Sequence, residues 1–98
     1  MNKNKDELSK LKPKIVKILR NRGIKKAGIF GSFVRGEQKK SSDIDIVIEP
    51  TDDMSLLGFV DVKFELEDKT GRKVDISTYK SLHPLLRKKI LEEEIKVI

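Results

Sequence analysis

The chain has 98 residues, no cysteine and a formal net charge of +6 at pH 7. This length suits one domain with a modest core, and the lack of cysteine excludes a disulfide framework and a thiolate zinc site. No apolar run is long enough to span a membrane and the first ten residues lack the apolar stretch of a secretory signal, so we expect a cytoplasmic protein. The positive charge favours phosphate-bearing partners or an acidic protein. Because the chain has only four Phe, one Tyr and no Trp, the aromatic platform of general nucleic-acid binding is not visible, and direct nucleic-acid binding is not expected.

The first third of the chain predicts a helix, a short strand and a helical turn. Apolar residues recur at helical spacing over residues 6–22, which predicts an amphipathic helix that ends at Gly23. Pro13 should kink this helix or break it into two pieces. Residues 25–30 predict a strand, and residues 32–35 predict one helical turn with Ser32 as cap and Gly36 as terminator. The apolar residues of the helix are Leu8, Leu11, Ile15, Ile18 and Leu19.

The rest of the chain predicts two more strands, two more helices and an apolar tail. Strands are expected at residues 44–49, which Pro50 stops, and at residues 73–77. Helices are expected at residues 55–70, closed by Gly71, and at residues 84–94. Their apolar sides are Leu56, Leu57, Val60 and Phe64 in the first, and Leu85, Leu86, Ile90 and Leu91 in the second. The tail 95–98 could add an edge strand or cover a partner. We therefore expect a single α/β (α+β) domain over residues 1–98, with helices packed on a small mixed sheet.

Three aspartates lie at matching places in two of the predicted strands. Side chains alternate along a strand, so Asp43 and Asp45 share one face while the isoleucines between and after them share the other. Asp75 has the same parity in the later strand, and the intervening helix suits a crossover that brings the two strands together in parallel. Each aspartate alone fits a turn, a cap or a plain strand position. Together, three converging carboxylates need cations between them, and their hard oxygen ligands suit Mg²⁺ or Mn²⁺.

A Gly-Ser pair follows the first strand and opens the helical turn. Free backbone N–H groups at such a turn favour phosphate, Gly31 allows a ligand to approach the backbone, and the Ser32 hydroxyl can donate to a phosphate oxygen. The plainer interpretation is that Ser32 only caps the turn. Arg35 could reach a phosphate, pair with a carboxylate or lie on the surface. Two other residues with chemically active side chains are interpreted as structural. His83 directly precedes Pro84 and fits the start of a helix, and Tyr79 is the single tyrosine.

The segments "FGS", then ten residues, then "DIDI", and later "VDI" resemble the signature of the DNA polymerase beta-like nucleotidyltransferase superfamily. The longer stretch "GSFVRGEQKKSSDIDIVI" and the ending "LLRKKILEEEIKVI" are similar to its minimal nucleotidyltransferase (MNT) branch, whose members are about this short. The resemblance covers the chain from about Ile24 to its end. It implies a polymerase beta-like nucleotidyltransferase fold.

The resemblance also implies site residues and a reaction. Asp43 and Asp45 would hold two Mg²⁺ ions, with Mn²⁺ as a substitute, and Asp75 would ligate the catalytic ion and help to accept the proton of the acceptor hydroxyl. Gly31 and Ser32 would grip the β- and γ-phosphates of a nucleoside triphosphate, with Arg35 as a further candidate. No covalent enzyme intermediate is expected.

Relatives in this branch are commonly antitoxins of small helical HEPN-domain toxins, onto whose tyrosine they transfer AMP from ATP. The resemblance therefore implies an adenylyltransferase antitoxin whose partners are ATP and a HEPN toxin in a hetero-oligomer, with a homodimer allowed for the isolated chain. One alternative is a nucleotidyltransferase that modifies a small hydroxyl compound. The other is a non-catalytic nucleotide-binding module that neutralises its partner by contact.

Overall fold

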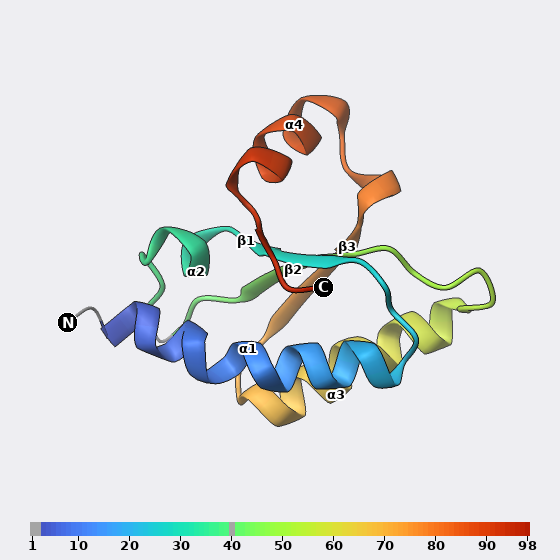
Figure 1. The fold of residues 1–98 in the computed structure, drawn as a ribbon, viewed down its shortest axis with the longest axis horizontal. Helices are drawn as coiled ribbons and strands as arrows, with labels where there is room; N and C mark the ends of the chain where they lie inside the picture. The colour runs from blue at the N-terminus through green and yellow to red at the C-terminus, as the bar shows by residue number, and fades with distance from the viewer. Residues whose placement is uncertain (1–2, 40) are drawn as a thin grey trace.

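The computed structural model describes residues 3–39 and 41–98, which form one mixed sheet with helices on both sides (Figure 1). The sheet is four-stranded, in the order β3-β2-β1-β4. Strand β1 pairs antiparallel with β2 and β4, whereas β2 and β3 are parallel. The predicted mixed sheet and the predicted crossover are therefore confirmed. The elements are α1 (Lys3–Asn21), β1 (Ala27–Phe30), α2 (Ser32–Arg35), β2 (Ile44–Ile48), α3 (Leu56–Thr70), β3 (Val74–Thr78), the 3₁₀ turn η1 (Tyr79–Ser81), α4 (Pro84–Glu93) and β4 (Ile95–Lys96).

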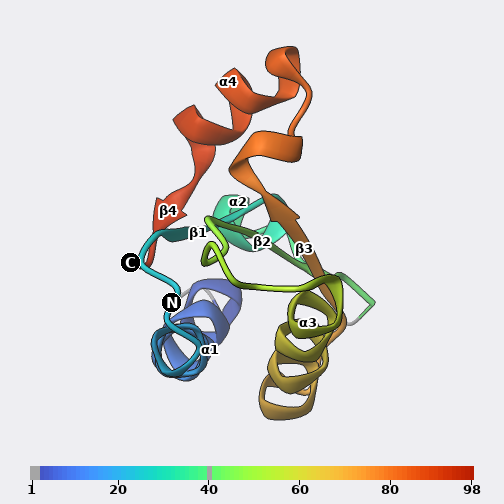
Figure 2. The ribbon, with the colours of Figure 1, turned by 90° about the vertical axis from the view of Figure 1, so that its right-hand side faces the viewer.

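Helices α1 and α3 cover one face of the sheet, and α4 stands on the other side (Figures 1 and 2). The covered face carries Ile44, Ile46 and Ile48 of β2, and none of the three is exposed to solvent. Burial of side chains of this size contributes roughly 1.5–3 kcal/mol each. The alternation that puts isoleucines into the core therefore turns Asp45 to the opposite face, where the predicted site lies.

Helix α1 packs on the sheet through the predicted apolar side. Leu11, Ile15, Ile18 and Leu19 are buried, and the helix continues through Pro13. The prediction that Pro13 could break the helix into two pieces is therefore wrong. Proline removes one backbone hydrogen bond, whose acceptor would be the carbonyl of Ser9. Because Ser9 and Pro13 are exposed, water can serve that carbonyl, while the buried residues hold both halves of the helix on the sheet.

Helices α3 and α4 differ from the predicted packing. In α3 the fully buried side chains are Val62 and Leu66, whereas Leu56, Leu57 and Phe64 of the predicted apolar side are 78%, 77% and 59% exposed. The side of α3 that meets α1 and the sheet is thus a different one from the side with most apolar residues. In α4 only Ile90 of the predicted apolar stripe is buried. The exposed large residues of that stripe are Leu85, Leu86 and Leu91.

The apolar tail docks on the chain's own sheet. Residues Ile95 and Lys96 form β4 beside β1, and Val97 is buried. Just before β4, Glu94 accepts a hydrogen bond of 3.0 Å from the Tyr79 hydroxyl. Burial and this carboxylate raise the pKa of Tyr79 above its ordinary value. Tyr79 is therefore a buried contact between η1 and the start of β4.

Helix α1 begins three residues before the predicted start, and the other predicted boundaries lie within one or two residues of the observed ones. Ser55 caps α3 by accepting from the backbone N–H of Gly58 at 3.1 Å, and His83 caps α4 through its Nδ1. Both Gly36 and Gly71 end their helices in the left-handed conformation. The cap of α2 is a correction, because Gly31 takes that position and Ser32 is the first helical residue. Across the described residues, no helix combines the length and apolar character needed to cross a membrane.

Candidate active site

Asp45 and Asp75 lie at neighbouring positions on the face of the sheet opposite α1 and α3, and Asp43 lies just before β2. Asp45 in β2 is the register partner of Asp75 in β3, and Asp43 comes two residues before Asp45. Since register partners in parallel strands point to the same face, the carboxylates of Asp45 and Asp75 stand side by side. Asp45 is half-buried, whereas Asp43 and Asp75 are exposed.

The protonation of Asp45 reflects this crowding. Burial raises the pKa of Asp45 to about 6, and the negative charges of Asp75 and Asp43 add to that rise, while Arg35 opposes it. A bound cation would stabilise the ionised form of Asp45, because it would offset both the lost hydration and the repulsion from the other two carboxylates.

The carboxylates of Asp45 and Asp75 share a face without forming a closed cluster of ligands. Within residues 3–39 and 41–98, no three acidic or histidine side chains form a group that could hold a metal as they stand. The register and the mutual effect on the Asp45 pKa nevertheless put the three charges close together. Because Asp43 and Asp75 are exposed, their carboxylates can change rotamer toward Asp45 without repacking the core. The oxygen donors then match the ligand preference of Mg²⁺ or Mn²⁺.

Gly31 lies directly against the Asp45 carboxylate. Its φ is +79°, a conformation that side-chain-bearing residues rarely adopt, and a Cβ at this position would lie 2.2 Å from Asp45 Oδ2. The turn that follows is held by the carbonyl of Gly31, which accepts from the backbone N–H groups of Val34 and Arg35 at 3.1 and 3.2 Å. The structure thus brings Gly31 of the predicted Gly-Ser pair directly against the predicted carboxylate of Asp45.

Arg35 lies at the edge of this group. Its guanidinium donates to Glu37 at 3.1 Å and to Glu93 of α4 at 2.5 Å, and both interactions are exposed. These hydrogen bonds, first to Glu93 and then to Glu37, raise the pKa of the Arg35 guanidinium above its ordinary value. Of the roles considered for Arg35, pairing with a carboxylate is the one seen.

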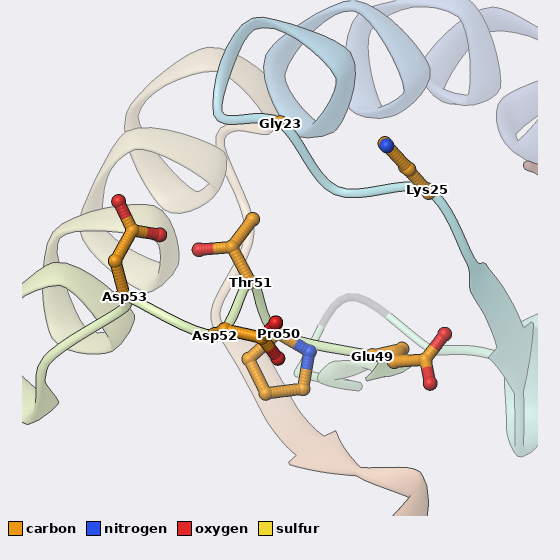
Figure 3. Close-up of a pocket in the computed structure, with 7 residues that line it drawn as sticks. All are labelled: Gly23, Lys25, Glu49, Pro50, Thr51, Asp52 and Asp53. Carbon is orange, nitrogen blue, oxygen red and sulfur yellow. The ribbon is translucent and has the colours of Figure 1, made fainter.

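Two hollows lie near the ends of β2. One, of about 290 Å³, is beside the carboxylates, and Asp43 lines it together with Ser41, Ser42, Gly71, Arg72 and Lys73. The other, of about 410 Å³, is at the far end of β2, where Figure 3 shows the carboxylates of Glu49, Asp52 and Asp53 and the ammonium of Lys25 around it. Asp43 lines the first hollow and none of the three predicted aspartates lines the second, so the second hollow lies apart from the predicted site.

Sequence reasoning missed Arg72, which lies between α3 and β3 and whose guanidinium binds carbonyl groups just ahead of Asp43. The only sequence signal is its position, three residues before Asp75. An arginine in a short connection more often lies on the surface, so the pattern alone could not have indicated this contact.

Known proteins are similar to this chain in sequence and in fold. The family model described as "Polymerase beta, Nucleotidyltransferase" matches residues 13–98. A protein of Methanocaldococcus jannaschii named "Putative protein adenylyltransferase" is 48% identical over 91 residues, which cover 93% of this chain and 98% of that one. The protein adenylyltransferase MntA of Thermococcus cleftensis is 40% identical over 82 residues, 83% of each chain.

Solved structures extend the comparison. A structure described as a "putative minimal nucleotidyltransferase" superposes with a TM-score of 0.82 at 30% identity and covers 93% of both chains. The MNT antitoxin in complex with a tri-AMPylated HEPN toxin of Shewanella oneidensis shares the fold, with a TM-score of 0.72 at 20% identity, over 92% of this chain and 71% of that one. The family match spans most of the chain and includes the aspartates and the Gly-Ser pair. The chain therefore belongs to the polymerase beta nucleotidyltransferase family.

Proposed function

We propose that this protein is a protein adenylyltransferase antitoxin, which transfers AMP from ATP to a tyrosine of a HEPN-domain toxin with the help of divalent metal ions. The observation that carries the proposal is the pairing of Asp45 with Asp75 on neighbouring parallel strands, with the Gly31 backbone against the Asp45 carboxylate. The names of the two relatives, both protein adenylyltransferases, support the choice of AMP and of a protein acceptor.

The three carboxylates would suit two divalent ions, with Mg²⁺ as the first choice and Mn²⁺ as a substitute. Asp43 and Asp45 would hold both ions and Asp75 one of them. The raised pKa of Asp45 supports this assignment, because the charged form of that carboxylate lacks a compensating cation. When bound, the ions supply charge neutralisation of the triphosphate and a lower pKa for the acceptor hydroxyl.

The chain's own residues would bind the nucleotide and handle the proton. Gly31 and Ser32 would receive the β- and γ-phosphates, with the Ser32 hydroxyl as a donor. As the tyrosine oxygen forms its bond to the α-phosphorus, the bond from that phosphorus to the β-phosphate oxygen breaks and pyrophosphate leaves. Asp75 would accept the proton from the tyrosine hydroxyl, a role that its exposure allows.

A protein acceptor suits the open geometry of the site. The carboxylate face is not covered by α1 or α3, and two of its three aspartates are exposed, so a tyrosine on a large partner can approach them. We expect the isolated chain to bind ATP with Mg²⁺ but to transfer AMP slowly to water or small alcohols. The acceptor's own surface would then complete the site.

The test is an incubation with ATP labelled at the α-phosphate, Mg²⁺ and the HEPN-domain protein encoded beside this chain. The expected result is label on a tyrosine of that protein, absent with EDTA and absent with Asp45→Asn. Efficient labelling of an aminoglycoside or a similar hydroxyl compound by the chain alone would replace the proposal with the small-molecule alternative. Neutralisation of the toxin without any label transfer would favour the non-catalytic module.

A further inference from the structure

Arg72 joins several segments of the chain beside the carboxylates. Its Nε and Nη2 donate to the two carboxylate oxygens of Glu7 in α1, at 2.7 and 2.8 Å. Its Nη1 donates to the backbone carbonyls of Lys39 and Ser42, at 2.6 and 3.1 Å. The guanidinium also lies over the ring of Phe33 in α2, 4.8 Å from the ring centre. With 15% of its side chain exposed, Arg72 is a largely buried clamp.

Apart from α1, the segments that Arg72 joins carry the candidate active site. Phe33 follows Ser32 in the turn assigned to the phosphates, and Ser42 directly precedes Asp43. Arg72 itself stands three residues before Asp75 in the chain, and the backbone N–H of Ile44 donates to the carbonyl of Lys73 at 2.9 Å, where β2 and β3 begin. The loop that leads to Asp43 thus meets the start of β3 at this guanidinium.

The chemistry of the clamp requires arginine. The loop presents two carbonyl acceptors, and α1 presents a carboxylate that accepts two hydrogen bonds. A planar guanidinium with five N–H donors can serve them all while its face stacks on an aromatic ring. A lysine ammonium has three donors at one point and could not bridge the same groups.

We propose that Arg72 is a positioning residue for nucleotidyl transfer, which sets the placement of Asp43 relative to Asp75 and to the turn at Ser32. This inference rests on the proposed function, since it takes those residues as the reacting centre. Arg72 acts through backbone carbonyls and does not touch the substrate. Its loss therefore loosens the metal and nucleotide site itself, and not only the fold.

The test measures binding without an acceptor. Arg72→Ala is titrated with Mn²⁺ in the presence of a non-hydrolysable ATP analogue, and bound Mn²⁺ is followed by electron paramagnetic resonance. Removing partners that orient metal ligands typically lowers metal affinity roughly 10- to 100-fold, and we expect a loss in this range. Ethylguanidinium, added below denaturing concentration, should restore part of the affinity, because it can occupy the vacated space and bind the same carbonyls.

Arg22→Ala is the matched control. It also deletes an arginine that pairs with a glutamate, since Arg22, just after α1, contacts Glu65 of α3 at 3.0 Å. We expect this variant to keep wild-type Mn²⁺ affinity, and ethylguanidinium should not change that affinity. If Arg72→Ala is unfolded at the assay temperature, Arg72→Lys replaces it, and an affinity severalfold below wild type is expected.

Three results would overturn the inference. The first is wild-type Mn²⁺ affinity in the folded Arg72 variant. The second is an equal loss of Mn²⁺ affinity in Arg22→Ala, and the third is a loss of Mn²⁺ affinity in Arg72→Ala that ethylguanidinium does not reverse.

A different result would contradict the proposed function. If the wild-type protein binds Mn²⁺ and the analogue but modifies no HEPN-domain protein, the acceptor assignment is wrong, while the comparison of Arg72→Ala with Arg22→Ala still decides the role of the clamp.

Discussion

Asp45→Asn should stabilise the metal-free protein while it abolishes AMP transfer. In the folded chain the pKa of Asp45 is raised from 3.8 to about 6, first by burial and then by Asp75 and Asp43. One pKa unit corresponds to about 1.4 kcal/mol, so the full shift would correspond to about 3 kcal/mol. Because the side chain is only half-buried, solvent screening reduces this figure, and we expect about 1 kcal/mol.

The pH dependence identifies the cause of the effect. The folded state disfavours the charged form of Asp45, so the penalty is absent below the unfolded pKa near 4, grows as the pH rises and is complete above about 6. Asparagine carries no charge at any of these values. The gain of Asp45→Asn over the wild type should therefore be near zero at pH 4 and reach about 1 kcal/mol at pH 7.

Urea unfolding in EDTA at the two pH values gives this difference directly. Asp61→Asn, which changes an exposed aspartate of α3 outside the site, controls for the loss of a surface charge. Mg²⁺ with ATP should reverse the order, because the wild type gains stability from the bound ions and the variant does not. If metal-free Asp45→Asn is less stable than the wild type at pH 7, Asp45 is a structural carboxylate and the reasoning is wrong.

Three further predictions concern single contacts. Ser32→Ala should weaken triphosphate binding by roughly 1–3 kcal/mol and monophosphate binding much less, and equal losses by calorimetry would place Ser32 elsewhere. Gly31→Ala should remove Mn²⁺ binding, because its Cβ would lie 2.2 Å from Asp45 Oδ2, whereas Gly58→Ala in α3, with no atom nearer than 3.5 Å, should bind normally. Tyr79→Phe should lower the free energy of unfolding by about 1–3 kcal/mol, because Glu94 loses its donor, and transfer rates per folded molecule should stay unchanged.

The placement of the aspartates could be predicted because it follows from the backbone alone. Alternation along a strand is imposed by covalent geometry, so a run of buried isoleucines determines where the residues between them point. The connection between β2 and β3 is similarly constrained, because a crossover that contains one helix usually brings the next strand in parallel to the previous one. Asp45 and Asp75 become register partners once both constraints hold.

The packing sides of the later helices could not be predicted in the same way. Any side of a helix can face the core, and the packing of neighbouring elements determines which side is buried. In α3 the side chains buried against the rest of the domain are Val62 and Leu66, whereas Leu56 and Leu57 in the first turn are exposed. The contacts of Arg72 could not be predicted for a related reason, because its partners Glu7 and Ser42 are 65 and 30 residues away in the chain.

The pairing of Arg35 bears on how the site would receive a nucleotide. Its two glutamate partners are held in exposed ion pairs, and such pairs contribute little to stability because water solvates the separated charges well. A triphosphate at Gly31 would present a higher density of negative charge to the same guanidinium, one turn of α2 away. Exchange of Glu93 for a phosphate would therefore cost little. The carboxylate pairing seen for Arg35 is thus compatible with the phosphate role that the sequence suggested.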